Sequence, residues 1–185
     1  MFSNSILITD FTLTDNSPVY QNQTWTGQII TRNSGINFFT ISFKVQTTKD
    51  NRAELQRFQA EHSLGRPFKM SLGWYSQYSG EQEGAVLVTA PVAVASYKIP
   101  VSNNKLEVGT LIQFSSTTKL YKVLANTGTE LSIYPSLRKP ISGGEVIKFN
   151  NLTGTFILTN DNNKTNYVSE NIISMDITAT EDVTG

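Results

Sequence analysis

One run of alternating residues constrains the fold of this chain more than any other feature. In the stretch INFFTISFKVQTT, residues 36–48, every second residue from position 37 falls on one side of an extended chain, and Thr40, Ser42 and Lys44 fall on the other. A period of two is typical of a β-strand with one buried face. The stretch therefore predicts a half-buried strand whose inward residues are Asn37, Phe39, Ile41, Phe43 and Val45.

Further runs typical of strands recur along the chain. Apolar and polar residues alternate around residues 7–13, at 68–72 and at 173–179, and Ile29 and Ile30 close another run that is bounded by Gly27 and RNSG. Between residues 86 and 150, short apolar runs separated by Asn, Gly and Pro follow one another about every ten residues, which is typical of a small closed barrel or a sandwich. Within this region Asn126-Thr127-Gly128 predicts a tight turn between two strands, because Asn and Gly tolerate positive backbone angles.

One segment interrupts the β pattern. TKDNRAELQRFQAEHSLGRP, residues 48–67, predicts a helix of about four turns. Asp50 and Asn51 are candidate N-caps, and Glu54 stands three residues after Asn51 as in a capping box. Leu55 and Phe58 are spaced to share one face, which predicts that this face is buried.

The charges divide the chain in the same way as the patterns. Residues 86–150 hold seven basic and three acidic side chains, a balance of +4, and the rest of the chain is therefore −4 because the net charge is zero. We expect a mainly β protein with one helix. It would consist of a split, β-sandwich-like domain, residues 1–85 and 151–185, and an inserted OB-like barrel, residues 86–150.

The composition leaves little room for catalysis. The chain has no cysteine, and His62 is its only histidine, so thiol chemistry, disulfides and cysteine-based zinc sites are excluded. No serine-elbow motif accompanies His62, and no glycine-rich phosphate loop occurs. We expect no enzymatic activity, no cofactor and no metal. No apolar run approaches the length of a membrane span, about 20 residues, and the first residues lack the features of a signal peptide, which favours synthesis in a cytoplasm.

Two loops carry the candidate contact residues. GWYSQYSGEQEG, residues 73–84, places Trp74, Tyr75 and Tyr78 in a loop of the kind on which sugars often stack. YPSLRKPI, residues 134–141, carries Arg138 and Lys139 in a proline-punctuated link between barrel strands. We regard these five residues as candidate contacts with a partner protein or a glycan.

Three functions that would use these loops or the barrel remain open. A carbohydrate-binding module for host recognition would use the aromatic residues of the first loop. A glycosidase would use Glu81 and Glu83 as its paired carboxylates, although two residues so close together on a loop do not by themselves fix a catalytic separation. A nucleic-acid-binding barrel would use its aromatic residues and lysines, but a balance of +4 is a weak electrostatic footprint.

The order of the elements resembles a known family. A β domain with one helix, interrupted by a small barrel and then resumed, is similar to the distal tail proteins of long-tailed bacteriophages, in particular the T-five-like branch. The similarity runs from Ile36 to the C-terminus. Its best-matching pieces are the strand–helix–strand run from Ile36 to Leu72 and the segments GTLIQFSSTTKLYKV and LSIYPSL.

The resemblance implies a function without catalysis. Six copies would form a ring at the virion tail tip that connects the tail tube protein to the hub and baseplate proteins, with the barrels outward as supports for fibre or collar proteins. Assembly would occur in the host cytoplasm, with no membrane partner and no specific nucleic acid, although DNA would pass through the ring. One feature departs from the pattern. OB folds often place a helix between their third and fourth strands, and ANTGT, residues 125–129, leaves room only for a turn.

Overall fold

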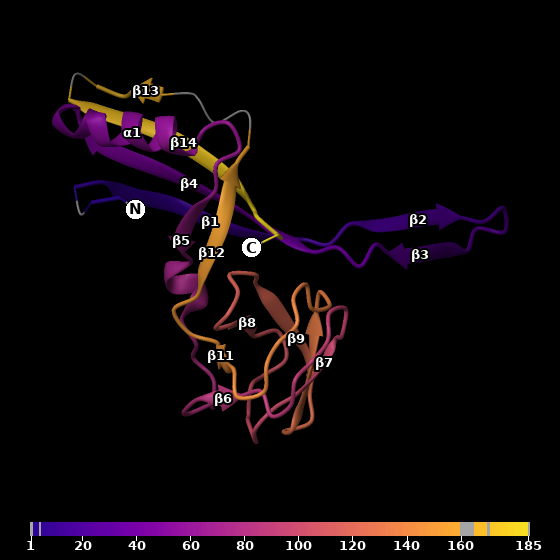
Figure 1. Ribbon diagram of the computed structural model, residues 1–185. Coiled ribbons are helices and arrows are strands. Elements are labelled where there is room, and N and C mark those ends of the chain that lie inside the picture. The colour runs from indigo at the N-terminus through magenta and orange to yellow at the C-terminus, as the bar shows by residue number, and fades with distance from the viewer. Residues whose placement is uncertain (1, 4, 160–164, 170, 185) are drawn as a thin grey trace. The chain divides into compact units, whose positions relative to one another are not determined.

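The computed structural model describes residues 2–3, 5–159, 165–169 and 171–184 (Figure 1). The described chain is mainly β with one α-helix and curled sheets, which confirms the predicted fold class. The elements in chain order are β1 (Leu7–Asn16), β2 (Val19–Gln23), β3 (Ile29–Asn33), β4 (Phe38–Thr48), η1 (Lys49–Asn51), α1 (Arg52–His62), β5 (Phe68–Ser71), η2 (Gly73–Ser76), β6 (Val86–Leu87), β7 (Lys98–Pro100), β8 (Leu111–Phe114), β9 (Tyr121–Asn126), β10 (Glu130–Tyr134), β11 (Val146–Lys148), β12 (Thr153–Leu158), β13 (Thr165–Tyr167) and β14 (Ile172–Glu181).

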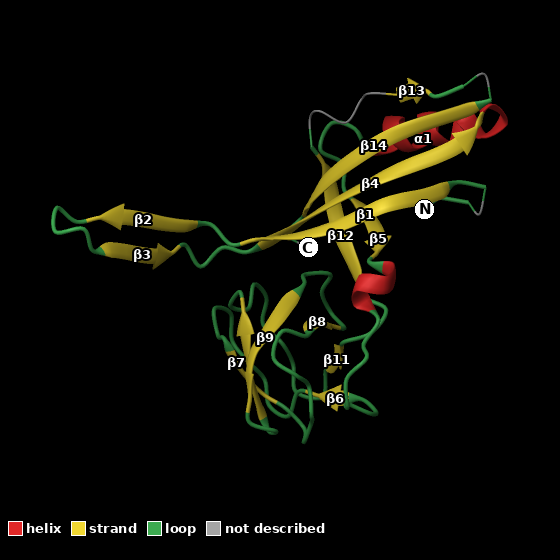
Figure 2. Cartoon of the chain, turned by 180° about the vertical axis from the view of Figure 1, so that it is seen from behind, coloured by secondary structure: helices red, strands yellow, loops and turns green. Residues whose placement is uncertain are grey.

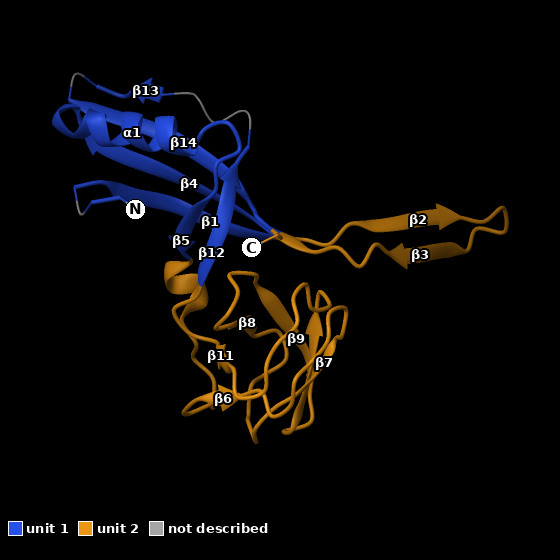
Figure 3. Ribbon diagram, in the orientation of Figure 1, with its two compact units in different colours: residues 1–14, 39–71, 153–182 blue, residues 15–38, 72–152, 183–185 orange. Residues whose placement is uncertain are grey.

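The chain divides into two compact units (Figure 3). The first comprises residues 1–14, 39–71 and 153–182, and the second comprises residues 15–38, 72–152 and 183–185. This division places residues 15–38 and 72–85 with the barrel strands, whereas the predicted barrel domain begins at residue 86. The domain boundaries given by the sequence stay a prediction.

The first unit is built on a sheet in which β1, β4, β14, β12 and β5 are neighbours in that order, with β13 added to β14. Figure 2 shows β1, β4 and β14 running alongside one another. The long antiparallel β4–β14 pair aligns Ile41 with Ala179 and Phe43 with Ile177. All five residues predicted to face inward from residue 37 to residue 45 are buried, which confirms the alternating pattern.

The helix of the first unit covers this sheet with the face that the sequence predicts. Leu55 and Phe58 are both buried. The Phe58 ring packs edge-on against Phe68 of β5 at 5.3 Å, and the Gln59 side chain contacts the sulfur of Met175 on β14. The apolar face of α1 therefore completes a core between helix and sheet. Among the described residues, no helix is long and apolar enough to cross a membrane.

The start of the helix differs from the prediction. α1 has eleven residues, about three turns, and Asn51 makes no side-chain capping bond. The Asn51 amide instead donates to the Thr48 hydroxyl at 3.2 Å. The Glu54 carboxylate accepts from the backbone N–H and the hydroxyl of Ser3, both at 2.7 Å. The predicted capping box is wrong because a segment distant in sequence provides the donors that Glu54 binds.

The second unit contains a curled six-stranded sheet in the order β6, β11, β8, β9, β10, β7. Its two end strands are linked, because Val88 forms an antiparallel bridge with Val101 and the Ser102 N–H donates to the Leu87 carbonyl at 2.8 Å. The barrel-like part encloses an apolar core made of Val86, Val88, Ile99, Val101, Leu106, Ile112, Phe114, Tyr121, Val123, Leu131, Ile133, Leu137, Ile141 and Ile147.

The turn between β9 and β10 lies where the sequence predicts it. Gly128 has φ of +90°, the left-handed region that favours glycine, but Asn126 is not among the residues with positive φ. Asn126 acts through its side chain instead, accepting from the Gly128 N–H at 2.8 Å and donating to the Asn104 side chain at 2.8 Å. Asn104 is buried and also donates to the Gly128 carbonyl at 2.9 Å. This amide network explains how so short a connection is held.

Candidate functional site

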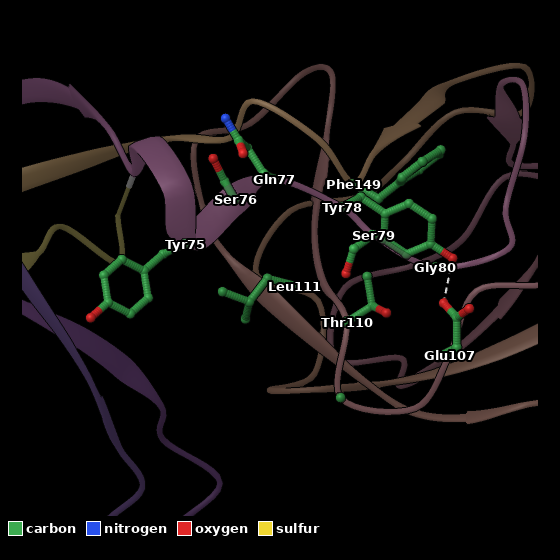
Figure 4. Close-up of a pocket in the computed structure, with 11 residues that line it drawn as sticks. Tyr75, Ser76, Gln77, Tyr78, Ser79, Gly80, Glu107, Thr110, Leu111 and Phe149 are labelled. Carbon is green, nitrogen blue, oxygen red and sulfur yellow. Dashed lines mark hydrogen bonds between the residues drawn. The ribbon is translucent and has the colours of Figure 1, made fainter.

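An open groove of about 490 Å³ lies in the second unit (Figure 4). It is lined by Tyr75, Ser76, Gln77, Tyr78, Ser79, Gly80, Glu107, Gly109, Thr110, Leu111 and Phe149. Aromatic rings, hydroxyl groups, an amide and one carboxylate therefore meet on one surface. A volume of this order is typical of sites for small ligands.

The short helical turn η2 positions the first side of the groove. Gly73 has φ of +53°, which lets the chain leave Leu72 and enter the turn. The buried Ser76 hydroxyl donates to the Gly73 carbonyl at 3.0 Å, and the Asn151 N–H donates to the Ser76 carbonyl at 3.0 Å. These bonds fix the backbone of η2, and Tyr75 remains about half exposed, at 53%.

The second side of the groove is a pair formed by Tyr78 and Glu107. The Tyr78 hydroxyl donates to the Glu107 carboxylate, as the dashed line in Figure 4 marks, and the Glu81 N–H donates to the other carboxylate oxygen at 2.8 Å. The Tyr78 ring packs edge-on against Phe149, with centroids 4.9 Å apart. A Cβ atom on Gly80 would lie 2.2 Å from a Glu107 oxygen, so a larger residue at this position would displace the Glu107 side chain.

These hydrogen bonds shift the ionisation of both groups. The bond from Tyr78, followed by the bond from the Glu81 N–H, lowers the pKa of Glu107, because both stabilise the carboxylate. Burial and then the bond to Glu107 raise the pKa of Tyr78. Near neutral pH the pair is therefore a neutral phenol that donates to an ionised carboxylate. Glu107 is the only charged residue among those that line the groove.

The bond between Glu107 and the Glu81 N–H gives a direct test of this arrangement. The pKa of Glu107 in the folded protein lies below its ordinary value of 4.5. The bond is therefore fully present above pH 4.5 and is lost as the pH falls through the lowered pKa of Glu107. We expect the amide proton of Glu81 to shift on acidification in NMR spectra, with a midpoint below 4.5. In Glu107→Gln this transition should disappear, and an unchanged transition would contradict the bond.

The groove brings together two of the five predicted contact residues. Tyr75 and Tyr78 both line it, whereas Trp74 is 87% exposed on the same turn and is not among the lining residues. Arg138 and Lys139 are exposed after β10, and the Arg138 backbone N–H donates to the Tyr121 hydroxyl at 3.3 Å. These two cations do not line the groove either.

The residues weighed for catalysis lie elsewhere. Glu81 and Glu83 line a different cavity of about 370 Å³ with Lys105, whose ammonium is 3.7 Å from the Glu81 carboxylate. His62 belongs to the first unit, where its ring packs against Phe58 and Phe68. In the described ranges no group of three or more His, Cys, Asp or Glu side chains could hold a metal ion.

The hairpin formed by β2 and β3 is a second candidate surface. All ten residues of its two strands are exposed. Antiparallel pairing sets Val19 opposite Asn33 and Gln23 opposite Ile29 on one face, and Asn22 opposite Ile30 on the other. Tyr20 shares the second face with Ile30. Apolar side chains therefore occupy both faces of the hairpin, and Trp25 in its loop is 99% exposed.

The base of the hairpin is tied to the barrel strands of the same unit. The Tyr134 hydroxyl lies within hydrogen-bonding distance of the Asn33 side chain at 2.9 Å and of the Ile36 carbonyl at 3.1 Å. The Lys122 ammonium binds the Asp15 carboxylate, which Asn37 also contacts. Although burial opposes the shift, the bonds from Lys122 and Asn37 lower the pKa of Asp15, so the carboxylate is charged near neutral pH.

Sequence reasoning found the aromatic loop but missed the groove. Glu107 and Phe149 complete it, and they come from segments 29 and 71 residues beyond Tyr78. No local pattern marks either residue, so only the fold brings them to Tyr78. No protein-family model matches this chain, and comparison with curated proteins gives no match. Its function must therefore be inferred from the residue geometry of the groove and the hairpin.

Proposed function

We propose that this protein is a noncatalytic structural subunit of a bacteriophage tail tip. In this proposal six copies form a ring that connects the tail tube to the hub and supports peripheral tail proteins. The single observation that carries self-assembly is the exposed apolar hairpin β2–β3. The order of elements, with β4, α1 and β5 before the barrel strands and β12 and β14 after them, supports the resemblance to distal tail proteins.

The strands of the hairpin β2–β3 have no covering layer within the described chain. A two-stranded sheet alone is marginal in water, because neither face is covered by a second layer. Large apolar side chains are nevertheless gathered on it, namely Val19, Tyr20, Trp25, Ile29 and Ile30, each at least half exposed. Patches of this kind mark interaction surfaces in soluble proteins. We infer that another chain covers the hairpin in the working assembly.

The charge of the hairpin favours burial in an interface. Between Val19 and Asn33 the only charged residue is Arg32, and the remaining polar residues are Asn, Gln and Thr. Burying neutral side chains that can bond to one another avoids the large desolvation cost of charged groups. Because apolar residues lie on both faces, the hairpin suits a position between two neighbours better than a position flat on one surface.

The chain also carries an edge that a second copy could use. Among the described strands β1 lies at one end of the sheet of the first unit, and Leu7 and Ile8 on it are exposed. Open strand edges pair readily with strands of other chains. A contact between two different patches, hairpin to edge, is heterologous, and a heterologous contact that closes after a fixed rotation gives a ring.

Mass measurement on the purified full chain tests the proposal. Native mass spectrometry at increasing protein concentration should give a closed oligomer of six copies, and electron microscopy should show rings or short stacks. A tail tube protein from a long-tailed phage, added in excess, should increase the ringed fraction if the subunit assembles on the tube. A protein that stays monomeric at high micromolar concentration, with and without the tube protein, would contradict the proposal.

A further inference from the structure

We propose that the groove between Tyr75 and the Tyr78–Glu107 pair binds a neutral oligosaccharide. This inference does not depend on ring assembly, because every residue that lines the groove belongs to the second unit and none belongs to the hairpin β2–β3. The ligand class follows from three properties of the groove: its charge, its hydrogen-bonding groups and its aromatic rings.

The charge of the groove disfavours anions. Glu107 is the only charged lining residue, and the lowered pKa of its carboxyl keeps it ionised near neutral pH. Arg138 and Lys139 do not line the groove, so no cation there would offset the repulsion of a phosphate or a carboxylate. A ligand with hydroxyl donors and no negative charge fits this surface.

The hydrogen-bonding groups suit a polyol. A carboxylate has about four acceptor positions, and the Tyr78 hydroxyl, the Glu81 N–H and the backbone N–H of Glu107 itself each occupy one on Glu107. A position therefore remains for a ligand hydroxyl, and bonds to an ionised acceptor are stronger than bonds between neutral groups. The internal bonds fix the orientation of the carboxylate before a ligand arrives. Thr110 and Gln77 line the same groove and add polar groups that can both donate and accept.

The aromatic rings supply the apolar part of the surface. One face of a hexose presents C–H groups, and these pack well against an aromatic ring. The Tyr75 side chain is about half exposed and lies at one end of the labelled residues in Figure 4, with the Tyr78–Glu107 pair at the other. A site with polar and aromatic groups at both ends matches a chain of sugars better than a single sugar.

An organic cation is the competing ligand class, and the geometry disfavours it. A quaternary ammonium group is bound by several ring faces that surround it. Here Tyr78 and Phe149 pack edge-on against each other at 4.9 Å, so they do not form an open cage. An ion pair with an exposed carboxylate in an open groove is worth little in water.

Titration with defined trisaccharides tests the proposal. Maltotriose, cellotriose and N,N′,N″-triacetylchitotriose are added to the labelled full-length protein up to about 10 mM, well above the 1 mM dissociation constant that corresponds to about −4 kcal/mol. We expect at least one of them to shift the amide resonances of residues 75–80 and of Glu107. Tyr75→Ala and Thr110→Val should each weaken binding at least fivefold. Trp74→Ala is the matched control, because Trp74 is exposed on the same turn outside the groove, and it should bind normally.

Three results would overturn the proposal. The first is the absence of any shift with all three sugars at the highest concentration. The second is binding that Tyr75→Ala and Thr110→Val leave unchanged, since the sugar would then lie elsewhere. The third is binding of choline, added as the cationic probe, in the groove in place of all three sugars. Tyr75 and Thr110 are chosen because neither takes part in the Tyr78–Glu107 pair that holds the loop.

Discussion

Polar substitution on either face of the β2–β3 hairpin is expected to abolish assembly and leave the monomer folded. One variant combines Tyr20→Thr with Ile30→Thr, and the other combines Val19→Thr with Ile29→Thr. Each pair lies on one face of the hairpin, as the strand register defines it. All four side chains are at least half exposed in the single chain, so their loss removes no core contact. Threonine retains a high preference for strands.

The expected loss of association follows from the apolar surface that a neighbour would bury. Full burial of one large apolar side chain is worth about 1.5–3 kcal/mol, and these side chains are already partly buried in the single chain, so each pair contributes about 1.5–3 kcal/mol if a neighbour covers the rest. Since about 1.4 kcal/mol corresponds to a factor of ten, each double variant should weaken each contact between neighbours at least about tenfold. Native mass spectrometry gives the oligomeric state, and circular dichroism gives the fold of the monomer.

The control for the hairpin variants is Val108→Thr. Val108 is 66% exposed in a barrel loop, apart from the hairpin strands, so this change removes a similar side chain from a different surface. It should assemble as the unchanged protein does. Assembly that survives both hairpin variants would contradict the proposed role of the hairpin. Loss of assembly in one double variant and not in the other would show that a neighbour covers only one face of the hairpin. That result would contradict a position of the hairpin between two neighbours.

The strands were predictable because their burial pattern is local. Phe39, Ile41, Phe43 and Val45 are buried one after another on β4, and the alternation in the sequence contains that information directly. The helix face with Leu55 and Phe58 was predictable for the same reason, since spacing along a helix sets which side chains share a side. Residues whose environment depends on their near neighbours in the chain can be assigned from the sequence.

The hairpin and the groove were not predictable because their environments depend on distant segments. Ile29 and Ile30 have the apolar character of core residues, yet they are exposed because no second layer of the described chain covers β3. Glu54 matched a capping box, but Ser3, 51 positions away, provides the donors that it binds. Glu107 joins Tyr78 across 29 positions. Such contacts leave no periodic trace in a single sequence.

A second large effect is expected from the substitution Gly154→Ala in the core of the first unit. Gly154 is buried on β12, and Phe156 two residues later points to the same side of the strand. The Phe156 ring lies over Gly154, so that a Cβ atom would be 2.5 Å from one ring carbon and 2.6 Å from another. Phe156 is fully buried and packs near Phe68 at 6.2 Å, so the ring has little room to move away.

We expect Gly154→Ala to lower the free energy of unfolding by about 1–3 kcal/mol, the usual cost of overpacking a core. Alanine also restricts the unfolded chain, which favours folding by about 0.4–1 kcal/mol, so the observed loss is a net value. Denaturant unfolding measures it. The control is Gly143→Ala, because a Cβ atom on Gly143 would meet its nearest neighbours at 3.6 Å, an ordinary contact. This control has no clash to offset the restriction of the unfolded chain, so it should leave stability unchanged or raise it by up to about 1 kcal/mol.

A double-mutant cycle separates the clash with the Phe156 ring from other effects at Gly154. Phe156→Leu removes the ring atoms that the new Cβ atom would meet, at the cost of a smaller core side chain. If the clash causes the loss, Gly154→Ala should be nearly neutral or slightly stabilising in the Phe156→Leu background, and the two changes should be strongly non-additive. Additive losses would instead place the cost of Gly154→Ala in the backbone of β12, and the close approach of the ring would not be the reason that glycine stands at this position.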